Sequence, residues 1–281
     1  MNFFKNKKII ILGGAGSIGS ALVKKISEQK PKLLVALDNN EERLFNLRNK
    51  YICTPVIGDI RDEIRIKEVI GTYRPEIVIN AAALKHVGLC EENPVEAWKT
   101  NVEGLKNVLH ACDAYGVKKM VYVSTDKAVN PKCVMGKTKL EGEKLCLAWD
   151  NPDMEVVIVR FGNVVNSSGS VYEIWLRRIE EGLPLIVNHK KMRRYFMGIF
   201  EAVDLILKAV EIGKNGEKII LDMGDQKSIK ELAQWLIKIS RKDLKIIYSK
   251  PSKGEKFEEK LMTKNERSHA IKSEKLWIIK K

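Results

Sequence analysis

The chain has 281 residues, 44% of them hydrophobic and 31% charged, which suits one large α/β unit or a main domain with a smaller one. Its formal net charge is +14, but the lysines are spread along the whole chain without a nucleic-acid-binding motif, so we expect no nucleic-acid partner. No apolar run is long enough to span a membrane, the chain starts without a signal peptide, and the five cysteines form no CxxC pair, so we expect a cytoplasmic protein with reduced thiols, no membrane span and no metal site.

Short apolar runs alternate with amphipathic stretches over the first two thirds of the chain. Strands that are apolar throughout are typical of a parallel sheet covered on both faces, and their alternation with helices predicts a doubly wound, Rossmann-type α/β fold. Apolar residues recur at helical spacing over Ser17–Gln29, and a second helix should begin at Asn93-Pro94 and run to about Tyr115. The expected strands are Lys8–Leu12, Leu33–Leu37, Pro55–Ile57, Ile77–Ile79, Lys119–Ser124 and Glu155–Phe161.

The pattern loosens beyond Asn163. We therefore expect a dinucleotide-binding domain over residues 1–165 and, mainly, a smaller C-terminal substrate-binding lobe over residues 166–281. A helix near 200–213 should pack back on the sheet, and the lysine-rich residues 263–281 should be only partly ordered. The other elements expected here are a loop at Ser167–Ser170, a helix at Phe200–Ile212, a strand at Ile219–Met223, a helix at Ser228–Ser240 and a strand at Leu244–Tyr248.

The first expected strand leads into a glycine-rich turn, Gly13-Gly14-Ala15-Gly16-Ser17-Ile18-Gly19, which opens a helix. In this context the glycines allow a tight turn, close approach of the backbone to a pyrophosphate and close helix packing, and the phosphates lie at the positive end of the helix. Asp38 ends the second strand, where a carboxylate accepts hydrogen bonds from the adenosine ribose and repels a 2′-phosphate, and the neighbouring Asn39 and Asn40 supply no cation. We therefore favour NAD over NADP. A helix-capping role stays open for Asp38, and also for Asp59, which is placed to approach the adenine.

A second motif follows the expected central strand. It reads STDKAVNPKCVMGKTK from Ser124 to Lys139, and it places Met135 and Lys139 at i and i+4 on one helix face. Further motifs are NAAALKHV (80–87), EENP (91–94), KTNV (99–102), RFGNV (160–164), MRRYFM (192–197), LDMG (221–224) and GEK (254–256). From about residue 7 to residue 262 the chain thus resembles the CapD-like polysaccharide biosynthesis proteins, extended short-chain dehydrogenases that act mainly on UDP-N-acetylglucosamine.

Short-chain dehydrogenases normally have tyrosine and lysine at this i, i+4 pair, and the tyrosine moves the substrate's proton. Methionine cannot, so either hydride chemistry is lost or Asp126 and Lys127 have taken over the proton transfer. The resemblance implies a 4,6-dehydration: NAD oxidises C4 of the sugar, the C5 proton leaves, water is lost from C6, and the hydride returns to C6. Asp126 would then be the acid at the C6 oxygen, Lys127 the base near C5 and Thr125 the partner of the C4 oxygen, but which of Asp126 and Lys127 moves which proton stays open. The expected catalytic residues are Thr125, Asp126, Lys127, Met135 and Lys139, and Lys139 also holds the nicotinamide ribose.

The resemblance also implies the remaining site residues. Asn163 would contact the sugar nucleotide, and Arg194 its diphosphate, because the arginine fork bonds phosphate oxygens bidentately. Glu255 belongs to the same substrate site, and Lys85 and His86 would face the cleft, although a structural role for the lone His86 stays open. The expected cofactor-binding residues are Gly13, Gly16, Ser17, Ile18, Gly19, Asp38, Asp59, Ile60, Ala81, Ala82 and Lys139.

Three other functions stay open. A nucleotide-sugar 4-epimerase would re-reduce the ketone on its other face, although epimerases on this fold usually keep the tyrosine. A non-catalytic NAD-sensing protein would bind NAD without sugar turnover, and a nucleic-acid binder is motivated by the charge alone. We expect a UDP-linked N-acetylhexosamine as the substrate and a homo-oligomer as the assembly, while the exact sugar, the nucleotide and the C5 outcome do not follow from the sequence.

Overall fold

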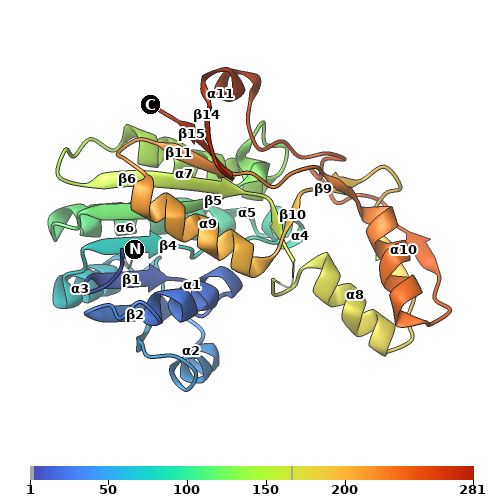
Figure 1. Ribbon diagram of the computed structural model, residues 1–281, viewed down its shortest axis with the longest axis horizontal. Coiled ribbons are helices and arrows are strands. Elements are labelled where there is room, and N and C mark those ends of the chain that lie inside the picture. Colours follow the sequence, from blue (N-terminus) through green and yellow to red (C-terminus); the bar gives the residue numbers. More distant parts are fainter. Residues whose placement is uncertain (1–2, 166) are drawn as a thin grey trace.

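A nine-stranded sheet forms the middle layer of the computed structural model, which describes residues 3–165 and 167–281 (Figure 1). Its strand order is β14-β15-β11-β6-β5-β4-β1-β2-β3, and all neighbours from β3 to β11 pair in parallel. The order reverses between β1 and β4, so this is the doubly wound arrangement that the sequence predicts. The parallel strands are β1 (Lys8–Leu12), β2 (Leu33–Asp38), β3 (Thr54–Ile57), β4 (Ile77–Asn80), β5 (Lys119–Thr125), β6 (Glu155–Phe161) and β11 (Lys218–Leu221).

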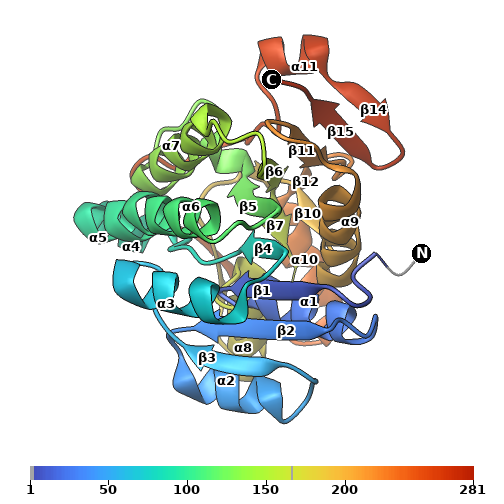
Figure 2. The ribbon, with the colours of Figure 1, turned by 90° about the vertical axis from the view of Figure 1, so that its left-hand side faces the viewer.

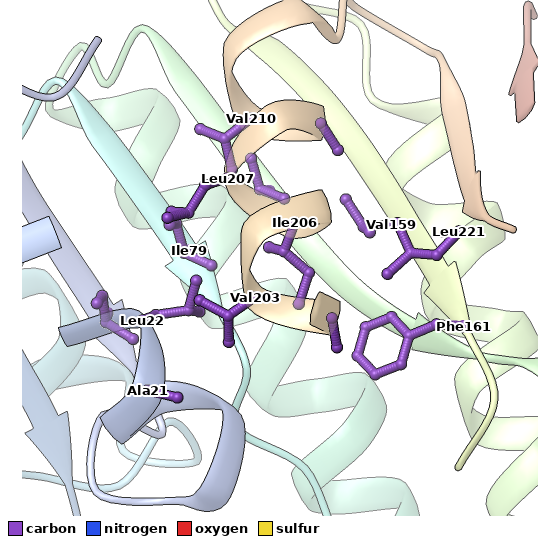
Figure 3. Packing of buried hydrophobic residues seen from close by; sticks show 14 of the residues in the cluster. Ala21, Leu22, Ile79, Val159, Phe161, Val203, Ile206, Leu207, Val210 and Leu221 are labelled. Atoms are coloured by element: carbon purple, nitrogen blue, oxygen red, sulfur yellow. The ribbon is translucent and has the colours of Figure 1, made fainter. Parts of the chain in front are cut away.

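Helices cover both faces of the sheet (Figure 2). On one face lie α1 (Ser17–Ser27), α2 (Glu41–Arg48) and α9 (Ile199–Ile212), which confirms that the helix near 200–213 packs back on the sheet. On the other face lie α3 (Glu63–Tyr73), α6 (Gly104–Ala114) and α7 (Val134–Ala148). Figure 3 shows the packing on the first face, where side chains of α9 meet those of α1 and of the sheet strands. The labelled residues are Ala21, Leu22, Ile79, Val159, Phe161, Val203, Ile206, Leu207, Val210 and Leu221.

The helix expected from Asn93 to Tyr115 is interrupted. It consists of α5 (Pro94–Trp98), a π-helical segment at Lys99–Glu103 and α6, and the short helix α4 (Val87–Glu92) precedes it. Asn101 in the π-helical segment is buried, and its side-chain amide pairs with both backbone groups of Leu84 and with the Thr138 hydroxyl at 2.8–3.0 Å. Such single π turns are frequent at functional sites. Here the segment fixes the loop that follows β4.

A smaller lobe stands apart from the sheet at the right of Figure 1. It is built from α8 (Val171–Glu180), α10 (Ile229–Ser240), β8 (Leu185–Val187) and β13 (Ile246–Tyr248), which pairs in parallel with β8. These elements enclose a core of their own around the buried Trp175. Two short ribbons join the lobe to the sheet: β7 (Asn163–Val164) with β10 (Phe196–Met197), and β9 (Arg193–Arg194) with β12 (Lys227–Ser228).

The prediction that residues 263–281 are only partly ordered is wrong. They form α11 (Lys264–His269), β14 (Ile271–Ser273) and β15 (Leu276–Ile279), and β15 pairs antiparallel with β11 at the edge of the large sheet. The reason is burial: Leu276 and Ile279 enter the main core, and Glu266 joins a buried ion-pair network. The expected domain boundary falls on residue 166, which lies outside the described residues. Within the part of the chain that the structure describes, no helix combines the length and the apolar character needed to cross a membrane.

Candidate active site

A cleft of about 850 Å³ lies at the carboxyl ends of the parallel strands, between the sheet and the lobe. In open α/β sheets, ligands bind at this edge where the strand order reverses. Of the expected site residues, Asp126 alone does not line the cleft. The expected residues that line the cleft are Gly13, Gly16, Ser17, Ile18, Gly19, Asp38, Asp59, Ile60, Ala81, Ala82, Lys85, His86, Thr125, Lys127, Met135, Lys139, Asn163, Arg194 and Glu255.

The glycine-rich turn leaves no room for side chains. Gly13 has a φ of +72°, and a Cβ added there would lie 2.7 Å from the backbone nitrogen of Ala82. A Cβ on Gly19 would lie 2.0 Å from the Gly13 carbonyl oxygen. The turn therefore brings the N-terminus of α1 against the loop after β4, which gives a cradle of the kind that receives a dinucleotide pyrophosphate.

Asp38 lies at the end of β2, fixed by backbone donors. Its carboxylate accepts 3.0 Å hydrogen bonds from the amides of Ala15 and Asn40. The capping alternative does not apply to α2, because Asn40 caps it by accepting from the Arg43 amide. Arg43 also lines the cleft, and sequence reasoning missed it because only the two asparagines after Asp38 were considered. The signal for this residue in the sequence was an arginine in the first turn of the helix that follows Asp38.

Asp59 is paired with a neighbouring arginine. Arg61 donates to both its carboxylate oxygens at 2.7–3.1 Å and also reaches Glu96. The hydrogen bond from Arg61 lowers the pKa of Asp59 below its ordinary value. Asp62, not Asp59, caps α3, so the capping alternative does not apply to Asp59 either. Asp59 thus presents an already paired carboxylate to the cleft.

The Thr125-Asp126-Lys127 segment, at the end of β5, places two charged side chains in contact beside the cleft. The Asp126 side chain is fully buried, and its Oδ1 accepts from Thr125 Oγ1 and from Lys127 Nζ, both at 3.0 Å. The ion pair is therefore not a surface pair, because Lys127 itself is 15% exposed and Asp126 is covered. The second oxygen of Asp126, Oδ2, is buried without a hydrogen-bond partner among the described residues. Proton exchange between Asp126 and a molecule in the cleft must therefore pass through Thr125 or Lys127.

Lys139 and Met135 form the adjoining wall on α7. Lys139 Nζ donates to the Val123 carbonyl oxygen at 2.6 Å and lies 4.1 Å from the centre of the Tyr122 ring. Burial lowers the pKa of Lys139 to about 8. Met135 is buried in a small apolar cluster with Cys90 and Cys133, so this position contributes shape and no proton carrier.

Residues 167–170 lie against the glycine-rich turn at one end of the cleft. The Ser168 amide donates to Ser17 Oγ at 2.8 Å, and Lys85 Nζ donates to the Ser168 carbonyl oxygen at 2.5 Å. The ring of His86 lies against Gly169, where a Cβ would come within 2.5 Å of it. Burial lowers the pKa of both Lys85 and His86, and for His86 the charge of Lys85 acts in the same direction. Sequence reasoning placed residues 167–170 in a loop but gave them no site role.

The lobe contributes an arginine that is held in place by its own partners. Arg194 donates to Glu255 Oε1 at 3.1 Å and to the Phe257 carbonyl oxygen at 3.1 Å, and its side chain is 5% exposed. Asn188, which sequence reasoning missed, donates to the other oxygen of Glu255 at 2.9 Å. Glu255 therefore positions Arg194 at the cleft wall. Among the described residues, no group of three or more His, Cys, Asp or Glu side chains is arranged to hold a metal ion.

Comparison with known proteins identifies the family. A family model described as "Polysaccharide biosynthesis protein" matches residues 9–281. The capsular polysaccharide biosynthesis protein CapD of Staphylococcus aureus is 41% identical over an alignment of 274 residues, which covers 93% of this chain and 46% of CapD. The chain thus spans about half the length of that relative.

Two further similarities bear on the fold and the chemistry. The UDP-N-acetylglucosamine 4,6-dehydratase (inverting) of Campylobacter jejuni serotype O:2 is 36% identical over 226 residues, covering 77% of this chain and 67% of the relative. The X-ray structure of Pen from Bacillus thuringiensis superposes with a TM-score of 0.94 at 33% identity, covering 99% of this chain and 89% of Pen.

Proposed function

Because the chain belongs to the polysaccharide biosynthesis protein family, we propose that it is an NAD-dependent nucleotide-sugar 4,6-dehydratase acting on UDP-N-acetylglucosamine. The observation that carries this proposal is the 3.0 Å contact between Asp126 and Lys127 at the cleft end of β5, beside an apolar Met135. Two proton-transfer groups in one turn suit an elimination, which removes one proton and adds another. The substrate is the one named for the Campylobacter relative.

Bound NAD would supply the hydride acceptor for C4 and the hydride donor for C6. The proton of the C4 hydroxyl, released with the first hydride, would pass through Thr125 to the Asp126 carboxylate, and the Lys127 ammonium would return a proton to C5 as the hydride reaches C6. Lys127, at the cleft wall, takes the C5 proton as a neutral amine and becomes an ammonium ion. The C6 hydroxyl leaves as water after receiving a proton from Lys127 or, through Thr125, from Asp126. Because Asp126 lies 3.0 Å from both Thr125 Oγ1 and Lys127 Nζ, the proton can pass between the three groups without entering bulk water.

The remaining residues bind and orient. The Lys139 ammonium group, fixed by the Val123 carbonyl, is suited to the ribose hydroxyls of the nicotinamide nucleotide. Arg194, fixed by Glu255, is suited to the substrate diphosphate. Asp38 favours NAD over NADP, and the proximity of Arg43 makes that choice worth testing directly.

The proposal is tested by incubating the protein with NAD and UDP-N-acetylglucosamine in deuterium oxide. We expect a product lighter by one water molecule, with the NMR spectrum of a 4-keto-6-deoxy sugar and solvent deuterium at C5. Lys127→Met should abolish the product. Lys137→Met, at an exposed position on α7, is the matched control and should leave it.

Each other result points to a different function. A galactosamine isomer without loss of water would indicate a 4-epimerase. Tight NAD binding with every nucleotide sugar unchanged would indicate a sensing role, and the dehydratase proposal would then be withdrawn.

A further inference from the structure

Asn163 lies where the chain leaves the sheet for the lobe. It begins β7, and its backbone amide donates to the Tyr195 carbonyl oxygen at 3.2 Å, so the parallel pairing with β10 fixes its position. The preceding residue, Gly162, packs on the catalytic carboxylate: a Cβ there would lie 2.8 Å from Asp126 Oδ2. The β7 backbone is thus held directly against the Asp126–Lys127 pair.

The Asn163 side chain faces that pair rather than standing free in the cleft. Its Oδ1 accepts from Lys127 Nζ at 3.0 Å, the same distance as that from Lys127 to Asp126 Oδ1. The amide thus turns its oxygen, which can only accept a hydrogen bond, towards Lys127 Nζ. Lys127 is therefore held by two acceptors, the carboxylate of Asp126 in the turn after β5 and the neutral amide of Asn163 on β7.

We propose, on the basis of the function proposed above, that Asn163 is a positioning residue for the proton transfer: its neutral oxygen fixes Lys127 Nζ at the cleft wall and keeps the number of carboxylates on that nitrogen at one. A second carboxylate would favour the ammonium form, which cannot accept the C5 proton. Without an acceptor at position 163, Lys127 would keep Asp126 as its partner but lose the second contact that fixes its flexible side chain. That side chain has to lie within reach of the C5 proton. An amide satisfies both requirements.

Other charged groups share the surroundings of Lys127. Lys139 of α7, Lys85 and His86 of the loop after β4, and Arg194 with Glu255 of the lobe line the same cleft. The thiol of Cys133, just before α7, is close enough for the charge of Lys127 to act on it. Of these groups Glu255 is the carboxylate, and it is already paired with Arg194. Asp126 is thus the carboxylate in direct contact with Lys127, and position 163 is where a second one would act most strongly.

The experiment measures how Lys127 titrates in the whole protein without any substrate. The protein is exposed to a trace of acetic anhydride at a series of pH values, and acetylation of the Lys127 peptide is followed by mass spectrometry. Asn163→Asp should move the midpoint of that profile up by about 1–3 pH units. Asn163→Leu should move it down. Asn49→Asp, which adds the same charge at an exposed site, should leave it unchanged.

Turnover separates positioning from substrate contact. With UDP-N-acetylglucosamine, both Asn163 variants should lose at least about tenfold in kcat with a smaller change in KM, and the Asn163→Asp variant should recover activity towards high pH. A rise in KM with an unmoved acetylation midpoint would overturn the inference, because it would make Asn163 a substrate contact only. Failure of the unchanged protein to release water counts against the dehydratase proposal alone, since the acetylation midpoint still reports on Asn163.

Discussion

A buried ion-pair network of Glu143, Arg160, Lys218 and Glu266 offers a sharp test of how the C-terminal segment stabilises the fold. Glu266 of α11 accepts two hydrogen bonds from Arg160 at 2.9 and 3.0 Å and one from Lys218 at 2.5 Å. Arg160 and Lys218 also contact Glu143, whose side chain is 1% exposed and which accepts from the hydroxyl of Ser124. The network therefore contains two positive and two negative charges, and Glu266→Gln leaves one positive charge in excess.

The magnitude follows from the pairing. Removing one partner of a buried ion pair costs about 3–5 kcal/mol. Here Arg160 and Lys218 keep Glu143, and Glu266 is 14% exposed, so we expect Glu266→Gln to lower the free energy of unfolding by about 2–3 kcal/mol. Burial alone would raise the pKa of Glu266, but the hydrogen bonds and charges of Arg160 and Lys218 outweigh it and lower the pKa to about 2.

This shift sets the pH dependence. A carboxyl whose pKa is lower in the folded state stabilises the fold fully above its unfolded value of 4.5, and the contribution is lost as the pH falls towards 2. Urea unfolding followed by circular dichroism should show the full difference between the two proteins at pH 7, and a difference smaller by about a quarter at pH 4. Glu201→Gln, which breaks the exposed pair with Lys275, is the matched control and should leave the midpoint unchanged. Equal stabilities at pH 7, or a difference that widens on acidification, would refute the reasoning.

Three further predictions concern the cofactor end of the cleft. Gly19→Ala should weaken NAD binding at least about tenfold in calorimetry because its Cβ would lie 2.0 Å from a carbonyl oxygen, whereas Gly88→Ala, with no atom within 4 Å, should bind normally. If Asp38 selects NAD, the unchanged protein should bind NAD more tightly than NADP, and Asp38→Ala should remove that preference. Tighter binding of NADP by the unchanged protein, lost in Arg43→Gln, would contradict the role of Asp38. Because burial takes the pKa of Lys139 to about 8, NAD affinity should fall as the pH rises from 7 to 9 and the ammonium is lost, and Lys139→Arg should abolish that fall.

The sequence predicts the large sheet well because its strands are apolar throughout. Lys8–Leu12 and Glu155–Phe161 are confirmed residue for residue as β1 and β6. The helix expected over residues 93–115 is confirmed in extent but not in geometry. The cause is a side chain, since buried Asn101 bonds to Leu84 and Thr138 far along the chain. Periodicity within a helix carries no record of such a partner.

The C-terminal segment also shows that the local sequence does not reveal distant partners. Residues 263–281 are rich in lysine, which favoured partial order, yet the segment pairs with β11 and its Glu266 enters the ion-pair network. One of the charges that make the segment look solvated, that of Glu266, is the one that binds it to the core. Its partners Arg160 and Lys218 lie more than 40 positions earlier in the chain, so the local sequence does not reveal the pairing. Composition cannot distinguish a charge that faces water from one that faces an opposite charge.

For the site, motifs identify the residues but not their contacts. Thr125, Asp126 and Lys127 are adjacent in the sequence, which suggests equal access to a substrate, yet the turn after β5 buries Asp126 and leaves Lys127 at the cleft wall. The motif of Asn163 predicts a substrate contact, and the structure adds a contact that the motif does not show, between its side-chain oxygen and Lys127 Nζ. With methionine in place of the usual tyrosine, the proton has to be carried by groups whose order of access only the tertiary structure sets. That order puts Lys127 first, Thr125 beside it and Asp126 behind both. In the proposed reaction Lys127 is therefore the group that meets the C5 proton, and Asp126 exchanges protons with the substrate only through Thr125 or Lys127.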